Sequence, residues 1–264
     1  MKRKNVLLIV DPQNDFVDPN GNLSVAGAVD DMNRVAELIK THGDKIDDIQ
    51  VTLDSHHPIH IAHPIYWVDR DGNHPNPFTI IEHSDVLSGQ WRTYNPRWNQ
   101  WGLDYTQALE NSPYKLCIWP EHCLIGSWGS SVYPPLFQAL KEWESKYFGV
   151  VNFVTKGSNI HTEHYGVAKA EVPRHDDLTT ELNTDFVTLL EECDDIYVTG
   201  EASSHCVSNS CMQIVDAFGV DGAKKMILLT DATSPVPGFE FLQDEFFKKL
   251  KEKGGRFETT KTLF

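Results

Sequence analysis

The chain has 264 residues, 40% of them hydrophobic, which is enough to bury the core of one large domain over residues 1–264. A formal net charge of −15 excludes the basic surface typical of nucleic-acid binders and favours a small neutral or cationic substrate. No apolar run approaches the roughly 20 residues of a membrane helix. Residues 1–10 lack the order of residues found in a signal peptide, and the 5 cysteines show no CxxC spacing. We therefore expect a reduced, cytoplasmic protein.

The first predicted strand is a continuous apolar run over residues 5–10 that ends at Asp11. Continuous rather than alternating hydrophobicity is typical of a strand buried on both faces of a parallel sheet. Ligands of open α/β sheets gather at the carboxyl ends of strands, so Asp11 is a candidate site residue, with the cap of a turn as the alternative. Apolar periodicity then predicts a helix over residues 29–39.

A second short strand over residues 50–53 ends at Asp54 and leads into a segment rich in histidine. Asp54 and four histidines lie within residues 54–63, and imidazole with carboxylate suits zinc, iron or manganese. Asp54 and His56 are two residues apart, so in an extended segment their side chains point the same way. A solvated loop with incidental histidines is the alternative. His122 can complete a metal site only if the fold brings it back to this segment.

From Pro64 to about Lys115 the composition changes to prolines and tryptophans, with no sustained period until residues 105–109. We expect a long ordered insertion at about residues 64–115, since so many aromatic side chains would be costly to expose. Loops of this length are commonly lids or binding elements. A subunit contact in a homo-oligomer is an equal alternative.

After the insertion, strands and helices alternate again. A short strand is expected over residues 115–118, a helix over 134–148 whose first turn holds Pro134 and Pro135, and a buried strand over 150–154. Lys156 follows that strand, where a lysine can lower the pKa of a neighbouring thiol and orient a carboxylate. Most lysines are simply exposed. A further helix is expected over residues 179–190, with Thr180 as its N-cap.

Residues 194–200 form a β-branched run that ends at a glycine, and small residues then lead to Cys206 at the start of an apolar-periodic segment over 207–218. This pattern predicts a strand, a tight turn and a helix. A thiol at a helix N-terminus lies among unpaired N–H groups that favour the thiolate and can hold an oxyanion. A buried structural cysteine is the alternative for Cys206, and the structural interpretation is preferred for Cys123.

The remaining elements are a strand over residues 225–230, a helix over 239–251 and an edge strand over 256–259. Strands that alternate with helices along the whole chain predict a single doubly wound α/β domain, with a mostly parallel sheet flanked by helices on both faces.

Five stretches in this order resemble the motifs of the isochorismatase-like cysteine hydrolases, and within them the nicotinamidases. They are residues 11–16 (DPQNDF), 54–56 (DSH), 119–123 (WPEHC), 155–157 (TKG) and 200–206 (GEASSHC). The resemblance implies a catalytic triad of Asp11, Lys156 and Cys206, and a divalent metal, with zinc expected first, held by Asp54, His56 and His122. It also implies a cis peptide at Glu201–Ala202, an oxyanion hole from the N–H groups of Ala202 and Cys206, and a substrate ring held between Phe16 and Trp119.

The chain departs from the family pattern at several points. The insertion lengthens the segment between His56 and His122, and His60 occupies an offset at which relatives often have a histidine, which makes it a candidate additional ligand. Glu201 stands where an apolar residue is more usual, and His205 precedes the cysteine where many relatives have tyrosine.

Together the motifs predict hydrolysis of nicotinamide to nicotinate and ammonia through a thioester on Cys206. The expected partner is a small-molecule amide, with no nucleic acid and no membrane. The alternatives are another small amide or ureide as substrate, a non-catalytic binding protein on this fold, and a thiol redox protein, for which Cys211 is the only candidate partner in its segment.

Overall fold

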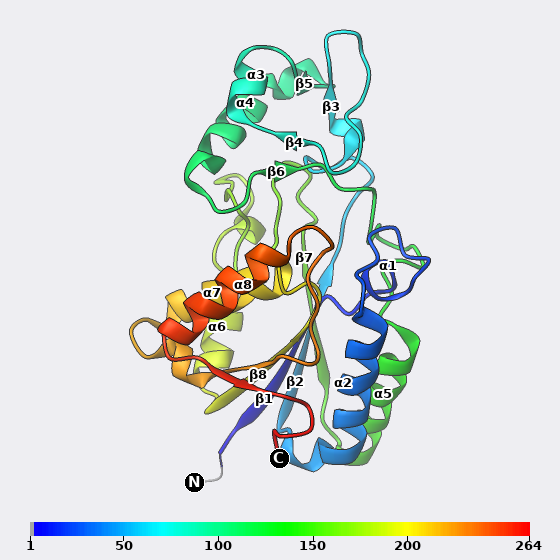
Figure 1. The fold of residues 1–264 in the computed structure, drawn as a ribbon, viewed down its shortest axis with the longest axis vertical. Helices are drawn as coiled ribbons and strands as arrows, with labels where there is room; N and C mark the ends of the chain where they lie inside the picture. The colour runs from blue at the N-terminus through cyan, green and yellow to red at the C-terminus, as the bar shows by residue number, and fades with distance from the viewer. Residues whose placement is uncertain (1–2) are drawn as a thin grey trace.

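The computed structural model describes residues 3–264 and is built around one parallel sheet (Figure 1). Its six strands lie in the order β10-β9-β8-β1-β2-β7, and every neighbouring pair is parallel. They are β1 (Asn5–Val10), β2 (Asp48–Asp54), β7 (Val151–Lys156), β8 (Asp195–Gly200), β9 (Met226–Leu229) and β10 (Arg256–Glu258). The expected doubly wound α/β fold is confirmed.

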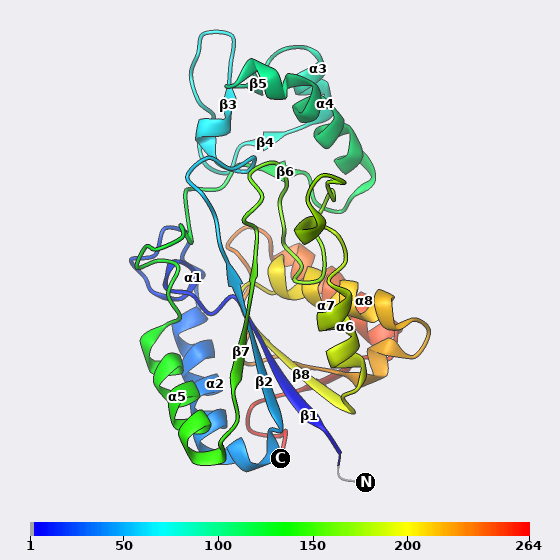
Figure 2. The same ribbon diagram turned by 180° about the vertical axis from the view of Figure 1, so that it is seen from behind.

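Helices cover both faces of this sheet, which explains why the central strands β1 and β8 are buried almost along their whole length. Helices α2 (Ala28–His42) and α5 (Pro134–Tyr147) pack together on one face. On the other face lie α6 (Thr184–Glu191), α7 (Cys206–Phe218) and α8 (Glu240–Glu252) (Figures 1 and 2). Strand β8 is buried along its whole length, and so is all of β1 beyond Asn5. A four-residue helix, α1 (Asn14–Val17), follows the turn after β1.

Several predicted elements differ from the structure. The strand expected to be buried over residues 150–154 is the edge strand β7, in which Asn152, Phe153 and Thr155 are exposed. The helix expected from residue 179 begins instead at Thr184, because the Asn183 side chain accepts a hydrogen bond from the N–H of Phe186 and caps it. Thr180 lies in a separate 3-10 turn, Leu178–Thr180. The strand expected over residues 115–118 is shorter, β6 (Leu116–Cys117), and pairs antiparallel with β4 (Ile80–Ile81) outside the central sheet.

The insertion lies above the carboxyl ends of the central strands (Figure 1, cyan to green) and contains small elements of its own. They are the paired strands β3 (Trp67–Val68) and β5 (Arg92–Thr93), strand β4, and helices α3 (His83–Leu87) and α4 (Asn99–Ala108). Helix α4 begins well before the expected periodicity, since packing overrides the weak local propensity at Gly102. A Cβ at Gly102 would lie 2.9 Å from Thr93 and 3.0 Å from Trp67.

Within residues 3–264, no helix has both the length and the apolar character needed to cross a membrane.

Candidate active site

Three strand or helix ends bring Asp11, Lys156 and Cys206 together at the carboxyl edge of the sheet. The Lys156 ammonium nitrogen lies 2.8 Å from Asp11 Oδ2 and 3.6 Å from Cys206 Sγ. All three side chains are buried. Acid, amine and sulfur therefore come within bonding reach, as the prediction of a cysteine hydrolase requires.

Neighbouring groups hold the acid and the amine in place. The Thr52 hydroxyl accepts a hydrogen bond from the N–H of Asp11 at 3.0 Å and donates one to Asp11 Oδ1 at 2.5 Å. Asp11 itself has a φ of 46°, a left-handed conformation that aims its side chain off the strand end. The Lys156 ammonium also donates to Asp54 Oδ1 at 3.1 Å and to the His164 carbonyl at 3.0 Å. The orientation of both groups is therefore set before any substrate arrives.

Burial controls the protonation states of this cluster. It raises the pKa of the Cys206 thiol well above its ordinary value, and the nearby Lys156 charge only partly opposes it. The Lys156 charge lowers the pKa of the thiol, as expected, but burial is the larger effect. Burial also raises the pKa of Asp11 against the opposing charge of Lys156. For Lys156, burial works to lower the pKa, but Asp11 and Asp54 outweigh it and raise the pKa. Asp11 and Cys206 both contact the Lys156 ammonium, so the acid lies close to the thiol proton.

The turn between β8 and α7 presents backbone donors beside the sulfur. The Ala202 carbonyl accepts from the N–H groups of His205 at 3.0 Å and Val207 at 3.1 Å. In the part of the chain that the structure describes, the N–H groups of Ala202 and Cys206 have no backbone acceptor, and both residues line one pocket. The Glu201–Ala202 peptide is cis, where the resemblance places it. Two free donors beside the Cys206 thiol are what an oxyanion hole requires.

Asp54, His56 and His122 form a compact ligand set next to the cysteine. Their ligand atoms all lie within 4.8 Å of one another, with His56 Nε2 2.9 Å and His122 Nε2 3.4 Å from Asp54 Oδ2. The Nδ1 atoms lie 3.1 Å from the Gly157 carbonyl in His56 and 2.8 Å from the Pro120 carbonyl in His122. Those contacts place the Nε2 lone pairs in the cluster, as in protein metal sites. One carboxylate and two imidazoles fit zinc, iron or manganese.

The cysteine, the ligand set and several aromatic rings enclose a narrow pocket. Its lining comprises Phe16, Leu23, Asp54, Trp119, His122, Glu163, Tyr165, Ala202, His205, Cys206 and Val236. Its volume of about 20 Å³ has room for about one water molecule. The Trp119 indole donates to the Tyr165 hydroxyl at 2.9 Å, and its ring centroid lies 5.2 Å from that of His205. A ring-sized substrate must therefore displace aromatic side chains as it enters.

Comparison with known proteins agrees with this geometry. No family model matches the chain. The nicotinamidase of Saccharomyces cerevisiae is 26% identical over 249 residues, which cover 94% of each chain. The solved structure of the yeast nicotinamidase superposes with a TM-score of 0.67 and 20% identity, covering 96% of this chain and 98% of the other.

Two further solved structures share the architecture. The pyrazinamidase of Pyrococcus horikoshii, solved in complex with zinc, superposes with a TM-score of 0.57 at 16% identity, over 97% of this chain and 99% of that one. An isochorismatase family protein from Desulfovibrio vulgaris gives a TM-score of 0.54 at 15% identity, over 98% and 96% of the two chains. The chain has the isochorismatase-like hydrolase fold. The resemblance to nicotinamidases predicted from the motifs is confirmed.

In this isochorismatase-like fold, the other histidines of residues 54–63 do not join the ligand set. His60 Nδ1 accepts from the N–H of Ala62 at 3.2 Å and its Nε2 lies 3.2 Å from the Thr162 carbonyl, so neither nitrogen is free for a metal. His63 Nδ1 contacts the Pro58 carbonyl at 3.1 Å, and its buried Nε2 has no partner among the described residues. His63 lies beside the ligand set, with its ring centroid 5.5 Å from that of His122.

The polar segment over residues 159–175, expected from its composition to form a loop and short helix near the same face, supplies two more pocket residues, Glu163 and Tyr165. They lie in an irregular part of the chain after β7, and the folded chain shows that they line the pocket together with Cys206. The Glu163 side chain is buried; its Oε1 accepts from the N–H of His164 at 2.9 Å, while Oε2 has no partner among residues 3–264.

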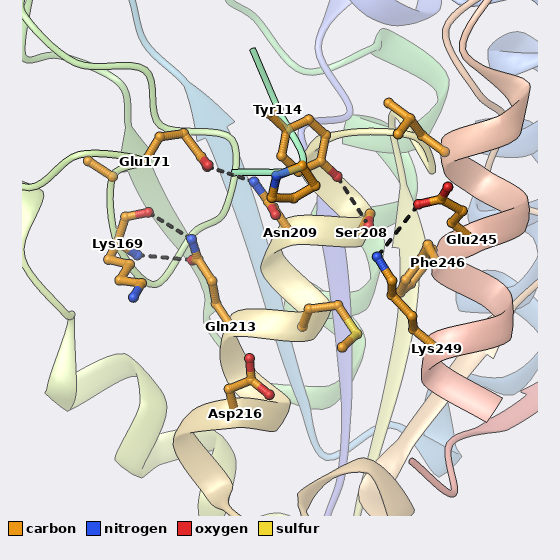
Figure 3. A pocket seen from close by; sticks show the side chains of 14 residues that line it. Tyr114, Lys169, Glu171, Ser208, Asn209, Gln213, Asp216, Glu245, Phe246 and Lys249 are labelled. Carbon is orange, nitrogen blue, oxygen red and sulfur yellow. Dashed lines mark hydrogen bonds and ion pairs between the residues drawn. The ribbon is translucent and has the colours of Figure 1, made fainter. Parts of the chain in front are cut away.

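A larger hollow of about 330 Å³ lies between α7 and α8 (Figure 3). Its polar side chains already bind one another. Asn209 donates to Glu171 at 2.6 Å, Tyr114 donates to Ser208 at 3.3 Å, and Glu245 lies 3.6 Å from Lys249. No cysteine or histidine lines it. The smaller pocket at Cys206 is therefore the candidate active site.

Proposed function

We propose that the chain is a nicotinamidase-like amidohydrolase, which hydrolyses the carboxamide of nicotinamide to nicotinate and ammonia through a cysteine thioester. The observation that carries the proposal is the contact of Lys156 with both Asp11 and Cys206, where Cys206 lines a pocket walled by aromatic rings. The similarity to the yeast nicotinamidase over 94% of both chains supports the choice of substrate.

The proposed reaction begins when Asp11 takes the thiol proton of Cys206 and Sγ attacks the carboxamide carbon. The N–H groups of Ala202 and Cys206 hold the oxyanion of the tetrahedral intermediate. Asp11 then returns the proton to the amide nitrogen as the C–N bond breaks, and ammonia leaves a thioester. Water attacks the thioester with Asp11 again as base, which releases the acid and restores the thiol. Lys156 keeps Asp11 oriented throughout.

Asp54, His56 and His122 would hold a divalent metal, which when bound supplies an electrophilic contact for a ring nitrogen of the substrate. Zinc is our first choice because the donor set suits it and because the Pyrococcus horikoshii pyrazinamidase was solved with zinc. Iron and manganese are the alternatives. Phe16 and Trp119 would hold the substrate ring between them. They would also shield the thioester from all water except the molecule that hydrolyses it.

The test is ammonia release from nicotinamide by the purified protein, compared with the Cys206→Ala and Cys211→Ala variants. Cys211 is a matched control because it is also buried, lies on the same helix and does not line the pocket. We expect Cys206→Ala to abolish release and Cys211→Ala to retain it. Release from a small carbamoyl compound but not from nicotinamide would replace nicotinamide by the alternative substrate class. Unchanged activity of Cys206→Ala would overturn the mechanism.

A further inference from the structure

A pair of buried carboxyl groups lies behind the turn that carries Ala202. Glu201 has no exposed surface, and Asp31 on α2 is only 2% exposed. The two carboxyl groups are neighbours, because both bind Ser234, and Glu201 Oε1 is buried with no hydrogen-bond donor among residues 3–264. Glu201 Oε2 also accepts from the N–H of Ser234 at 3.2 Å. A carboxyl side chain here is unexpected, because this position follows a fully buried strand.

The partners of Asp31 determine which carboxyl group carries a proton. Asp31 Oδ1 pairs with the Arg34 guanidinium at 2.6 Å, and Asp31 Oδ2 accepts from the Ser234 hydroxyl at 2.5 Å. Both oxygens of Asp31 therefore already have a donor, and one of these donors is a cation. Two anions in contact in a buried site repel each other, so the Glu201 carboxyl remains protonated and donates to Asp31. Burial first and the Asp31 charge second raise the pKa of Glu201 well above its ordinary value.

No other free charge competes for Glu201 within residues 3–264. Arg34 forms an ion pair with Asp31 and also donates to the Asp231 carbonyl. The Asp231 carboxylate accepts from the N–H of Thr260 at 2.8 Å and from its hydroxyl at 2.7 Å. From α8, the nearby side chain is the neutral Gln243, which accepts from Ser203 at 2.6 Å.

Ser234 connects the carboxyl pair to both sides of Ala202. The Ser234 N–H donates to the side chain of Glu201, the residue before Ala202. The Ser234 carbonyl accepts from the N–H of Ser203, the residue after Ala202, at 2.9 Å. The Glu201 N–H itself donates to the Val10 carbonyl at 2.8 Å, one residue before Asp11. The pair therefore joins the Ala202 turn to α2 and to the strand end that bears the catalytic acid.

We propose that protonated Glu201, hydrogen bonded to Asp31, is a positioning residue that holds the Ala202 N–H in place for the oxyanion, and that its ionisation at alkaline pH displaces this donor. The proposal rests on the proposed function. Glu201 does not touch the substrate and acts only through the turn.

The activity test compares Glu201→Gln with Glu201→Ala. Glutamine keeps a neutral donor for Asp31 and an acceptor for Ser234, so its kcat should stay within about threefold of the parent and its alkaline limb should extend to higher pH. Alanine removes both bonds, and kcat should fall about tenfold to a hundredfold, the range seen on loss or displacement of an oxyanion donor, with little change in KM. Equal kcat in the parent and Glu201→Ala would overturn the positioning role.

Urea unfolding against pH tests the protonation without any substrate. A group whose pKa is raised in the folded state adds stability below its unfolded pKa, and that contribution is lost as pH rises toward the folded pKa. The ratio of the parent's unfolding equilibrium constant to that of Glu201→Gln should therefore rise about tenfold for each pH unit above about 5.

The exposed Glu37 on the same helix as Asp31 supplies the control, because Glu37→Gln should follow the parent at every pH. A Glu201→Gln curve parallel to the parent would refute the protonated pair, and this readout remains decisive if Glu201→Ala does not fold. Failure of the proposed function looks different, since no variant would then hydrolyse nicotinamide while the unfolding curves could still diverge.

Discussion

Replacing Lys156 with methionine removes the cation from a buried cluster of three charges. The ammonium lies 2.8 Å from Asp11 Oδ2 and 3.1 Å from Asp54 Oδ1, and its side chain is 1% exposed. Breaking a buried ion pair by removing one partner costs about 3–5 kcal/mol, because an uncompensated charge stays buried. We expect Lys156→Met to lower the free energy of unfolding by about that amount at pH 8 in chelator-treated protein.

The loss should shrink as pH falls. In the parent, Lys156 has a pKa raised above its unfolded value, so its contribution is complete at neutral pH and is lost as pH rises from the unfolded pKa to the folded pKa. Without Lys156, burial raises the pKa of Asp11 unopposed by that cation. A carboxyl group with a raised pKa destabilises the fold above its unfolded pKa, so the variant should suffer less at pH 5.5 than at pH 8.

The control is Lys253→Met, the same substitution at an ion pair on the surface. Lys253 lies 3.1 Å from Asp216, but the two side chains are 47% and 66% exposed. Such pairs contribute about 0–1 kcal/mol. Urea unfolding followed by tryptophan fluorescence measures both variants at both pH values. A cost for Lys156→Met no larger than that for Lys253→Met, or one independent of pH, would refute the account of the buried cluster.

Three further outcomes are expected. Asp11→Asn should lower kcat for nicotinamide by about 10²–10⁴ because it removes the acid–base group, with binding of nicotinamide retained in calorimetry. Thr52→Val should destabilise the fold by about 1–3 kcal/mol in urea, since the Asp11 N–H and carboxylate both lose a buried partner. His122→Ala should abolish stoichiometric metal in elemental analysis, and chelation of the parent should remove an activity that zinc restores; activity indifferent to chelation would contradict the metal role.

The residues at the strand ends can be predicted from sequence because a local pattern marks them. Asp11 and Asp54 lie at or just after the ends of buried strands, Lys156 ends the partly exposed edge strand β7, and parallel strands end at one edge of the sheet. Cys206 is marked by the change from strand to helix periodicity. His122 has no such local signal, and only the resemblance joins it to Asp54.

The protonation of the nucleophile and the start of α6 could not be predicted in the same way. Local rules place Cys206 beside Lys156, whose charge lowers the pKa of the thiol, but the folded chain buries the sulfur and burial raises that pKa by more. Burial depends on residues from distant segments, so no local pattern contains it. At α6, both Thr180 and Asn183 are good caps, and packing of the chain decides between them.

The insertion acts on the pocket mainly through the segment after β7. The Tyr66 hydroxyl and the Trp101 indole each lie 2.7 Å from acceptors on His161, and the Tyr105 hydroxyl accepts from the N–H of Glu163 at 3.1 Å. Glu163 faces Cys206, so three aromatic residues of the insertion fix the backbone of one pocket wall without lining the pocket. The long separation of His56 from His122 in the sequence does not disturb the ligand set, because the ligand atoms of Asp54, His56 and His122 still lie within 4.8 Å of one another. The insertion packs above the strand ends and supports the loop from outside.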